Sequence, residues 1–185
     1  FRARRPAAAA AVGPLMNVED ADQPLVGFRR WAARRSGLYS GIFVAGRFVP
    51  TPARTLVAPR VKPIPWPTDD PHVAKCWLLR GHEAPFAACH CGLSAYYELE
   101  DEPDLPARDA VWGAIVAWGR IVECETGFRA QYARPVGLLD VYNPLDFARP
   151  LKRARDAAEA YGIPLLPRAE LVAYAAWHGE LHEAT

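Results

Sequence analysis

The sequence lacks any run of about twenty apolar residues, so it predicts no membrane-spanning helix. It is also poor in net charge: the formal value is +1, which gives no strong attraction to nucleic acid or to an anionic membrane. No phosphate-binding glycine loop, no G-x-S-x-G turn and no H-E-x-x-H motif occur. The familiar nucleotide-binding, serine hydrolase and metalloprotease classes are therefore unsupported.

About half of the 185 residues are apolar, which is enough for one domain with a core and too little for two independent cores. Residues 1–24 start with basic residues and an alanine run, but Pro6 and Pro14 interrupt that run and Met16 follows as an alternative start. We predict that this segment is a disordered leader, that residues 25–185 form a single domain, and that the protein is cytoplasmic. Its four cysteines should then be reduced thiols that are free to bind metal.

Two regions predict β-strands. Between Phe28 and Val49, the run L-Y-S-G-I-F-V-A-G-R-F-V predicts two short strands joined by a turn. Residues 109–142 predict a hairpin with its turn at Thr126-Gly127, and a helix over residues 110–118 is the competing interpretation, which two glycines and a β-branched run disfavour. In this hairpin one face would carry Val116, Trp118, Arg120, Val122 and Cys124. Prolines recur over residues 50–71 and predict an ordered loop or extended arm.

The last third of the chain predicts helices. The run P-L-K-R-A-R-D-A-A-E-A-Y-G begins with Pro150 at a first-turn position and stops at Gly162. Residues 163–167 predict a short connector or buried edge strand, and R-A-E-L-V-A-Y-A-A-W-H predicts a second helix. The fold class that follows is α+β: a small mixed or mostly antiparallel sheet, or a partly closed barrel, that carries C-terminal helices.

Metal-ligating residue types gather in one short stretch. The spacing is C-x5-H-x6-C-x-C, formed by Cys76, His82, Cys89 and Cys91. Zinc prefers four soft or borderline ligands in a tetrahedron. Side chains at i and i+2 of an extended backbone share a face, so the last two cysteines are placed to hold one ion while His90 faces away. We predict that these four residues converge on one zinc ion.

Other interpretations of this stretch remain open. Small buried thiols are common core residues, and a loop histidine is commonly a solvated polar group. His72 and Cys124 are reserve ligands, although a core thiol is the stronger interpretation of the latter. Glu83 directly follows His82 and distantly matches the H-x-E signature of zinc deaminases, but one residue early and without the P-C-x-x-C partner.

The run H-E-A-P-x4-C-x-C-G-L-x-A, followed by W-G-x-I-V and G-F-R-A-x-Y-A-x-P, resembles a group of small uncharacterised actinobacterial proteins. These proteins pair a C-x-C-G-[IL]-Y-A segment with a W-G-x-V…G-[YF]-R-A strand pair. The resemblance covers about residues 28–166, and Ser94 stands where those proteins often have tyrosine. It implies an architecture and no activity.

Arginines and aromatic residues alternate in the segment Phe28–Arg35, G-F-R-R-W-A-A-R-R with its preceding glycine. This mix is typical of surfaces that bind phosphates and stack on bases, but a solvated strand or turn whose aromatics enter the core is favoured at this low net charge. We take Arg29, Trp31 and Arg129 as candidate ligand-binding residues. The last of these follows the hairpin turn, where it meets either an anionic group or Glu125. One or two tryptophans are expected to line an aromatic pocket.

The favoured hypothesis is a non-enzymatic, zinc-stabilised binding or adaptor module for an unknown protein or small-molecule ligand. One alternative is a zinc-dependent hydrolase or deaminase with Glu83 as general base. A second alternative is a nucleic-acid-binding module that uses the Phe28–Arg35 segment. No membrane partner is expected.

Overall fold

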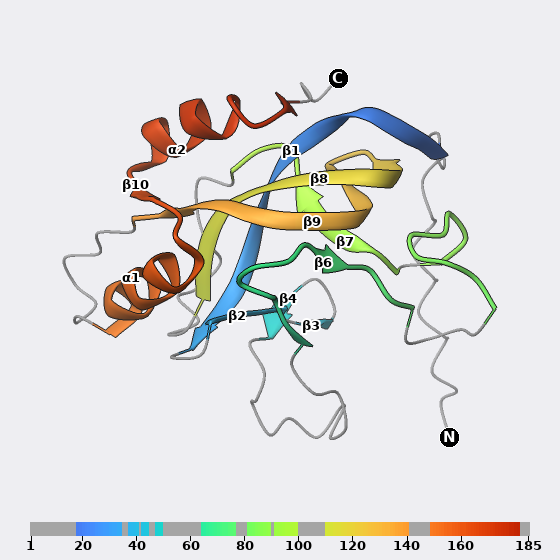
Figure 1. The fold of residues 1–185 in the computed structure, drawn as a ribbon. Helices are drawn as coiled ribbons and strands as arrows, with labels where there is room; N and C mark the ends of the chain where they lie inside the picture. Colours follow the sequence, from blue (N-terminus) through green and yellow to red (C-terminus); the bar gives the residue numbers. More distant parts are fainter. Residues whose placement is uncertain are drawn as a thin grey trace, which may run out of the picture.

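The computed structural model describes residues 18–34, 37–40, 42–44, 47–49, 64–76, 81–89, 91–99, 110–140 and 149–181. Strands dominate these residues, with two helices near the C-terminal end (Figure 1). The strands are β1 (Val18–Arg34), β2 (Gly37–Ser40), β3 (Ile42–Val44), β4 (Arg47–Val49), β5 (Ile64–Pro65), β6 (His72–Val73), β7 (Leu93–Tyr96), β8 (Ala110–Cys124), β9 (Gly127–Leu139), β10 (Leu165–Leu166) and β11 (Glu180–Leu181). The helices are α1 (Arg149–Tyr161) and α2 (Arg168–Ala175). No described helix is long and apolar enough to cross a membrane.

Three long strands organise the nine-stranded main sheet: β1, β8 and β9. β8 pairs with β1 on one edge and with β9 on the other, both antiparallel. β7 pairs with β9 and, through Phe28 and Tyr96, with β1. The pairings β1–β8–β9–β7–β1 therefore form a closed ring of strands.

The predicted hairpin is confirmed, and the competing helix over residues 110–118 does not form. Its turn is Glu125-Thr126, one residue earlier than predicted, because Gly127 already pairs with Cys124. Between the pairs Trp118–Tyr132 and Ile121–Ala130, β8 carries one extra residue. Such a bulge shifts the alternation by one position, so the single face predicted from Val116 to Cys124 is interrupted.

Side chains on the two faces of the strands build two buried clusters, as the alternation along a strand requires. In β1, Leu25, Trp31 and Ala33 belong to the first cluster, and Val26 and Phe28 belong to the second. The helices divide in the same way. α1 contributes Ala154, Ala157 and Ala158 to the first cluster, and α2 contributes Leu171 and Ala175 to the second. Cys89 and Cys91 lie in the first cluster.

The N-terminal end of the sheet lies within the segment predicted as a leader. β1 begins at Val18 and pairs with β8 from its first residue, and the division of the chain into a leader and one domain stays a prediction. Pairing with a distant strand overrides a local composition that reads as polar and irregular. Residues 1–17 lie outside the described residues.

The C-terminal predictions are confirmed. α1 ends at Tyr161, and Gly162 follows with φ +60°, a conformation that glycine adopts at little cost. β10 is the predicted short edge strand and pairs in parallel with β9, and α2 is the predicted second helix. β11, which pairs in parallel with β1, was not predicted.

The described end of the proline-rich region contributes β5. This strand pairs with β2 and lies at the edge of the sheet, where proline is tolerated.

The fold is thus a sheet-dominated α+β arrangement with antiparallel pairs, two parallel pairs and two helices among the described residues. The L-Y-S-G-I-F-V-A-G-R-F-V run, predicted as two strands joined by a turn, instead holds most of β2 and all of β3 and β4, of which the last two pair antiparallel. Residues 45–46, between β3 and β4, lie outside the described residues. The strands form a ring, and the partly closed barrel stays a prediction.

Candidate metal centre

Four side chains that were predicted as metal ligands lie together: Cys76, His82, Cys89 and Cys91. Cys76 follows β6, His82 lies in the loop that begins at Gly81, and the other two cysteines immediately precede β7. Both of these later cysteines are buried, whereas the first cysteine and the histidine are half-buried. In Figure 1 this loop lies at the side of the sheet away from α1 and α2.

The separations of the ligand atoms suit a tetrahedral ion. All four atoms lie within 4.8 Å of one another. The Sγ atoms of Cys76 and Cys89 are 3.7 Å apart, and His82 Nε2 is 3.3 Å from Cys91 Sγ. Zinc bonds of about 2.3 Å to sulfur and 2.0–2.1 Å to nitrogen, at the tetrahedral angle, separate two sulfurs by about 3.8 Å and a sulfur from a nitrogen by about 3.6 Å. The set therefore closes around one ion with small side-chain movements.

Sheet pairing explains why ligands from separate segments meet. β6 pairs with β9 at Tyr132 and Ala133, and β7 pairs with β9 from Gly127 to Ala130. The two short strands thus lie one after the other along β9, which brings the residues after β6 close to those before β7. The Ala74 N–H donates to the Gln131 carbonyl at 2.8 Å and extends the β6 pairing toward Cys76.

Gly92 links β7 to the metal loop, the name used here for residues 76–91, which carry the four candidate ligands. Its φ is +123°, a region that residues with a side chain rarely adopt. A Cβ atom there would lie 2.9 Å from the Arg129 Cβ and 3.0 Å from the Pro85 Cβ. The backbone therefore needs glycine at this position for two independent reasons, conformation and space.

Replacement of Gly92 by alanine is expected to destabilise the protein and to weaken metal binding. Backbone strain alone costs about 1–3 kcal/mol. The two contacts would also displace the backbone next to Cys91 and so move this ligand. Gly81→Ala is the matched control, because Gly81 also has positive φ (+95°) but its Cβ would meet no atom within 4 Å. Urea unfolding and competition with a chelator measure the two effects. Equal losses in both variants would contradict the steric part of this prediction.

Arg129, predicted as a ligand-binding residue, reaches from β9 to the backbone of the metal loop. Its Nη1 donates to the carbonyl oxygens of Phe86 at 3.4 Å and Cys91 at 3.1 Å, and also to that of Cys89. These carbonyls flank the two buried cysteines. The guanidinium group thus joins the sheet to the loop that carries the ligands, and its role toward an external ligand stays a prediction.

The surroundings of Cys91 keep its thiol protonated when no cation is bound. Its pKa is raised to about 11, mainly by burial; the Phe86 backbone N–H lowers it, and the neighbouring thiols of Cys89 and Cys76 raise it. Neighbouring thiols disfavour each other's ionisation, whereas a divalent cation displaces the protons. The same N–H would donate to the thiolate in a metal-bound site.

The reserve ligands lie apart from the cluster. The His72 ring stacks on Trp66 with centroids 4.9 Å apart, and burial, together with Arg29 and Lys75, lowers the pKa of His72 to about 4. Cys124 ends β8, and its Sγ approaches the Val122 carbonyl at 3.9 Å. Neither joins the four ligands. His90 lies outside the described residues, so its predicted orientation is not tested.

Arg29 and Trp31, the other candidate ligand-binding residues, lie in the interior. Trp31 is completely buried and packs edge-on against Trp66 at 5.4 Å. Arg29 donates to the Ser94 carbonyl, to Ser94 Oγ at 3.0 Å and to Ser40 Oγ at 3.2 Å, and lies 5.2 Å from the centre of the Trp66 ring. Burial lowers its pKa to about 10, so it stays charged at neutral pH.

This placement confirms the part of the interpretation that the segment is a strand whose aromatics enter the core: Phe28 is 2% exposed. The part that made the strand solvated is wrong, because Arg29 and Arg30 are each 8% exposed. Stacking of Phe28 or Trp31 on a base would require β1 to leave the sheet. Arg35 and the side chain of Arg34 lie outside the described residues.

The surroundings of Glu83 do not favour a role as general base. Its carboxylate forms an exposed ion pair with Arg120 at 3.1 Å. Two contributors to the site were missed in the sequence: the ring of Phe86, which lies 4.9 Å from the His82 ring, and the link from Arg129 to the loop carbonyls. No motif signals either one, because both contacts depend on the three-dimensional path of the loop.

Comparisons of the chain with protein-family models, with curated proteins and with solved structures give no match. The resemblance to the small actinobacterial proteins therefore stays a prediction.

Proposed function

We propose that this chain is a binding module without catalytic activity, stabilised by a structural zinc ion on Cys76, His82, Cys89 and Cys91. The observation that carries the proposal is the convergence of four ligand atoms within 4.8 Å of one another. Three thiolates and one imidazole suit zinc better than harder cations. A structural zinc site uses four protein ligands, whereas a catalytic site keeps one position open.

The ion would act as a clamp on the sheet. β6 has two residues and β7 has four, and strands this short gain little from backbone pairing alone. A metal that joins the end of β6 to the start of β7 would hold both against β9. Because the unfolded chain has no formed site, the binding free energy would contribute directly to folding.

Charge compensation also supports a closed structural centre. Three thiolates and a divalent cation leave one net negative charge, and the Arg129 guanidinium lies against the carbonyls of two ligand residues. The cation and the loop N–H groups would lower the nucleophilicity of the thiolates. The hydrolase or deaminase alternative needs an open coordination position and a free carboxylate, and Glu83 is paired with Arg120 on the surface.

Purified protein is expected to contain about one zinc ion per chain by elemental analysis. Chelation should lower its melting temperature, and replacement by cobalt should produce the visible absorption of tetrahedral thiolate coordination. Zinc far below one ion per chain, combined with a melting temperature that does not respond to chelator, would refute the proposal.

A further inference from the structure

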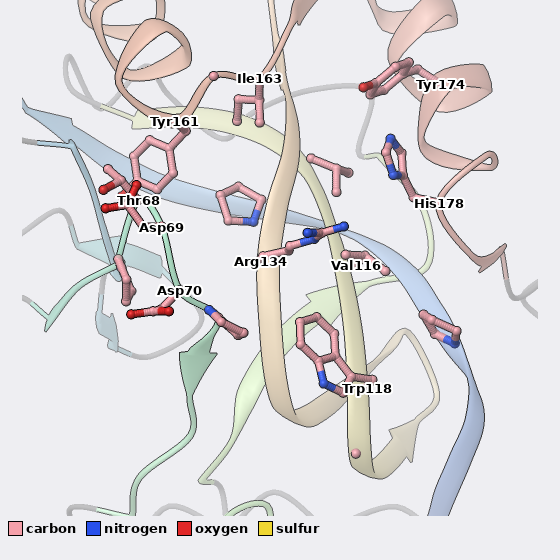
Figure 2. Close-up of a pocket in the computed structure, with 17 residues that line it drawn as sticks. Thr68, Asp69, Asp70, Val116, Trp118, Arg134, Tyr161, Ile163, Tyr174 and His178 are labelled. Atoms are coloured by element: carbon pink, nitrogen blue, oxygen red, sulfur yellow. The ribbon is translucent and has the colours of Figure 1, made fainter.

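A groove with a volume of about 940 Å³ lies on a different part of the molecule from the metal centre. Figure 2 shows it crossing β8 and β9 between the loop that follows β5 and the C-terminal end of α2. This volume is at the upper end of the range of small-molecule sites. Its lining includes Asp69, Asp70, Trp118, Arg134, Tyr174 and His178.

Arg134 provides a positive charge inside the groove. It is exposed, it projects from β9, and among the described residues no carboxylate lies within ion-pair distance of it. In Figure 2 its guanidinium group points across β8 toward the side where His178 and Trp118 lie. A guanidinium group matches the geometry of a carboxylate with two parallel hydrogen bonds. The groove is thus equipped for one anionic group.

Flat aromatic surface lies on the same side of the groove. Trp118 is half-buried, and its ring stacks on Tyr132 with centroids 6.1 Å apart, which holds the indole in place. Tyr174 and His178, which lie on the same side of Arg134 as Trp118 in Figure 2, form an edge-to-face pair at 4.8 Å. Rigid aromatic side chains of this kind bind flat apolar groups with little loss of conformational entropy.

The acidic end of the groove limits the charge of a ligand. Asp69 and Asp70 are exposed and, within the described part of the chain, have no basic partner. Two carboxylates in the lining of the groove repel a polyanion such as a nucleic-acid backbone. They tolerate a ligand with a single negative charge placed at the Arg134 end.

We propose that this groove binds a small aromatic carboxylate, with its carboxylate on Arg134 and its ring against Trp118. This site gives the proposed binding module a ligand class. It does not depend on the identity of the metal, because no metal ligand lines the groove.

Calorimetric titration of the zinc-loaded protein tests the proposal with benzoate, phenylacetate and indole-3-acetate, each compared with its uncharged amide. At least one carboxylate is expected to bind tenfold or more tightly than its amide. Arg134→Gln should remove at least tenfold of that affinity. Arg155→Gln, at an exposed position on α1 outside the groove lining, is the matched control and should bind as the unaltered protein does.

Zinc content and melting temperature are measured on the same samples, so that a failure of the metal proposal is recognised separately. Equal binding of acids and amides, no binding of any acid, or full affinity in Arg134→Gln would overturn the groove proposal. Adenosine monophosphate serves as a second anion source. Tighter binding of this nucleotide than of every carboxylate would also overturn it, in favour of a phosphate ligand.

Discussion

Cys89→Ser is expected to lose its metal and to unfold far more readily than the unaltered protein. Cys89 is 6% exposed, and its Sγ lies 3.7 Å from that of Cys76. A serine hydroxyl does not ionise as a thiol does, so the ion would keep three ligands beside a buried polar group. Structural zinc contributes about 10–16 kcal/mol of binding free energy in small zinc-finger peptides. Loss of one ligand should therefore cost about 3 kcal/mol or more.

In a chain of this size that loss corresponds to about 6–12 °C in melting temperature. Elemental analysis and thermal denaturation with and without chelator measure it. The chelator should destabilise the unaltered protein and leave Cys89→Ser unchanged, because both treatments end in the same metal-free state.

Cys124→Ser is the matched control. It makes the same chemical change in a half-buried thiol that lies outside the cluster. It should keep its zinc and lose only about 1 kcal/mol or less. If Cys89→Ser retained a full complement of zinc and melted with the control, the four-residue centre would be wrong.

The parts of the fold that the sequence predicts are those with local signals. α1 has a proline at its first turn and Gly162 after its last residue. The β8–β9 hairpin has β-branched residues before a short turn, and aromatic and polar residues that alternate after it. The four candidate metal ligands could be grouped from the sequence because all lie within sixteen positions of one another and belong to residue types that share one chemistry.

What the sequence does not predict depends on pairing between distant segments. The first residues of β1 are polar, and they are strand only because β8 lies beside them. The bulge near Gly119 shifts the alternation of β8. An isolated glycine in a strand is a signal for a bulge, but the predicted single face from Val116 to Cys124 did not use it. The candidate ligand-binding residues Arg29 and Trp31 are buried because β1 pairs with β2, β7 and β8, which a linear pattern of arginines and aromatics does not reveal.

Arg129 shows the same dependence at the candidate site. In sequence it is an arginine just past a turn, available to any anion. In the sheet it lies opposite Ser94 of β7, three positions after Cys91, so its side chain reaches back over the metal loop. The pairing of β9 with β7 therefore decides which groups the guanidinium meets.

Arg129→Met is expected to weaken zinc binding by about 10–100-fold, the usual effect of removing a group that hydrogen-bonds to metal-ligating residues. Methionine keeps much of the side-chain volume but donates no hydrogen bond. The carbonyls of Phe86, Cys89 and Cys91 then lose their donor, and each poorly paired carbonyl costs about 1 kcal/mol or more where it is shielded from water. The loop would lose its attachment to β9, and the free energy of unfolding should fall by about 2–4 kcal/mol.

Arg120→Met separates this effect from a simple loss of charge. Arg120 lies on the same hairpin, but its guanidinium pairs with Glu83 on the surface, with side chains 33% and 76% exposed. An exposed pair of this kind contributes about 0–1 kcal/mol, so Arg120→Met should bind zinc as the unaltered protein does. Competition with a chromophoric chelator gives the zinc affinities, and urea unfolding gives the free energies. If both methionine variants bound zinc equally well, Arg129 would have no part in supporting the metal loop. If Arg129→Lys bound zinc as tightly as the unaltered protein, a single positive charge would suffice, and the hydrogen bonds to several carbonyls would not contribute to the zinc affinity.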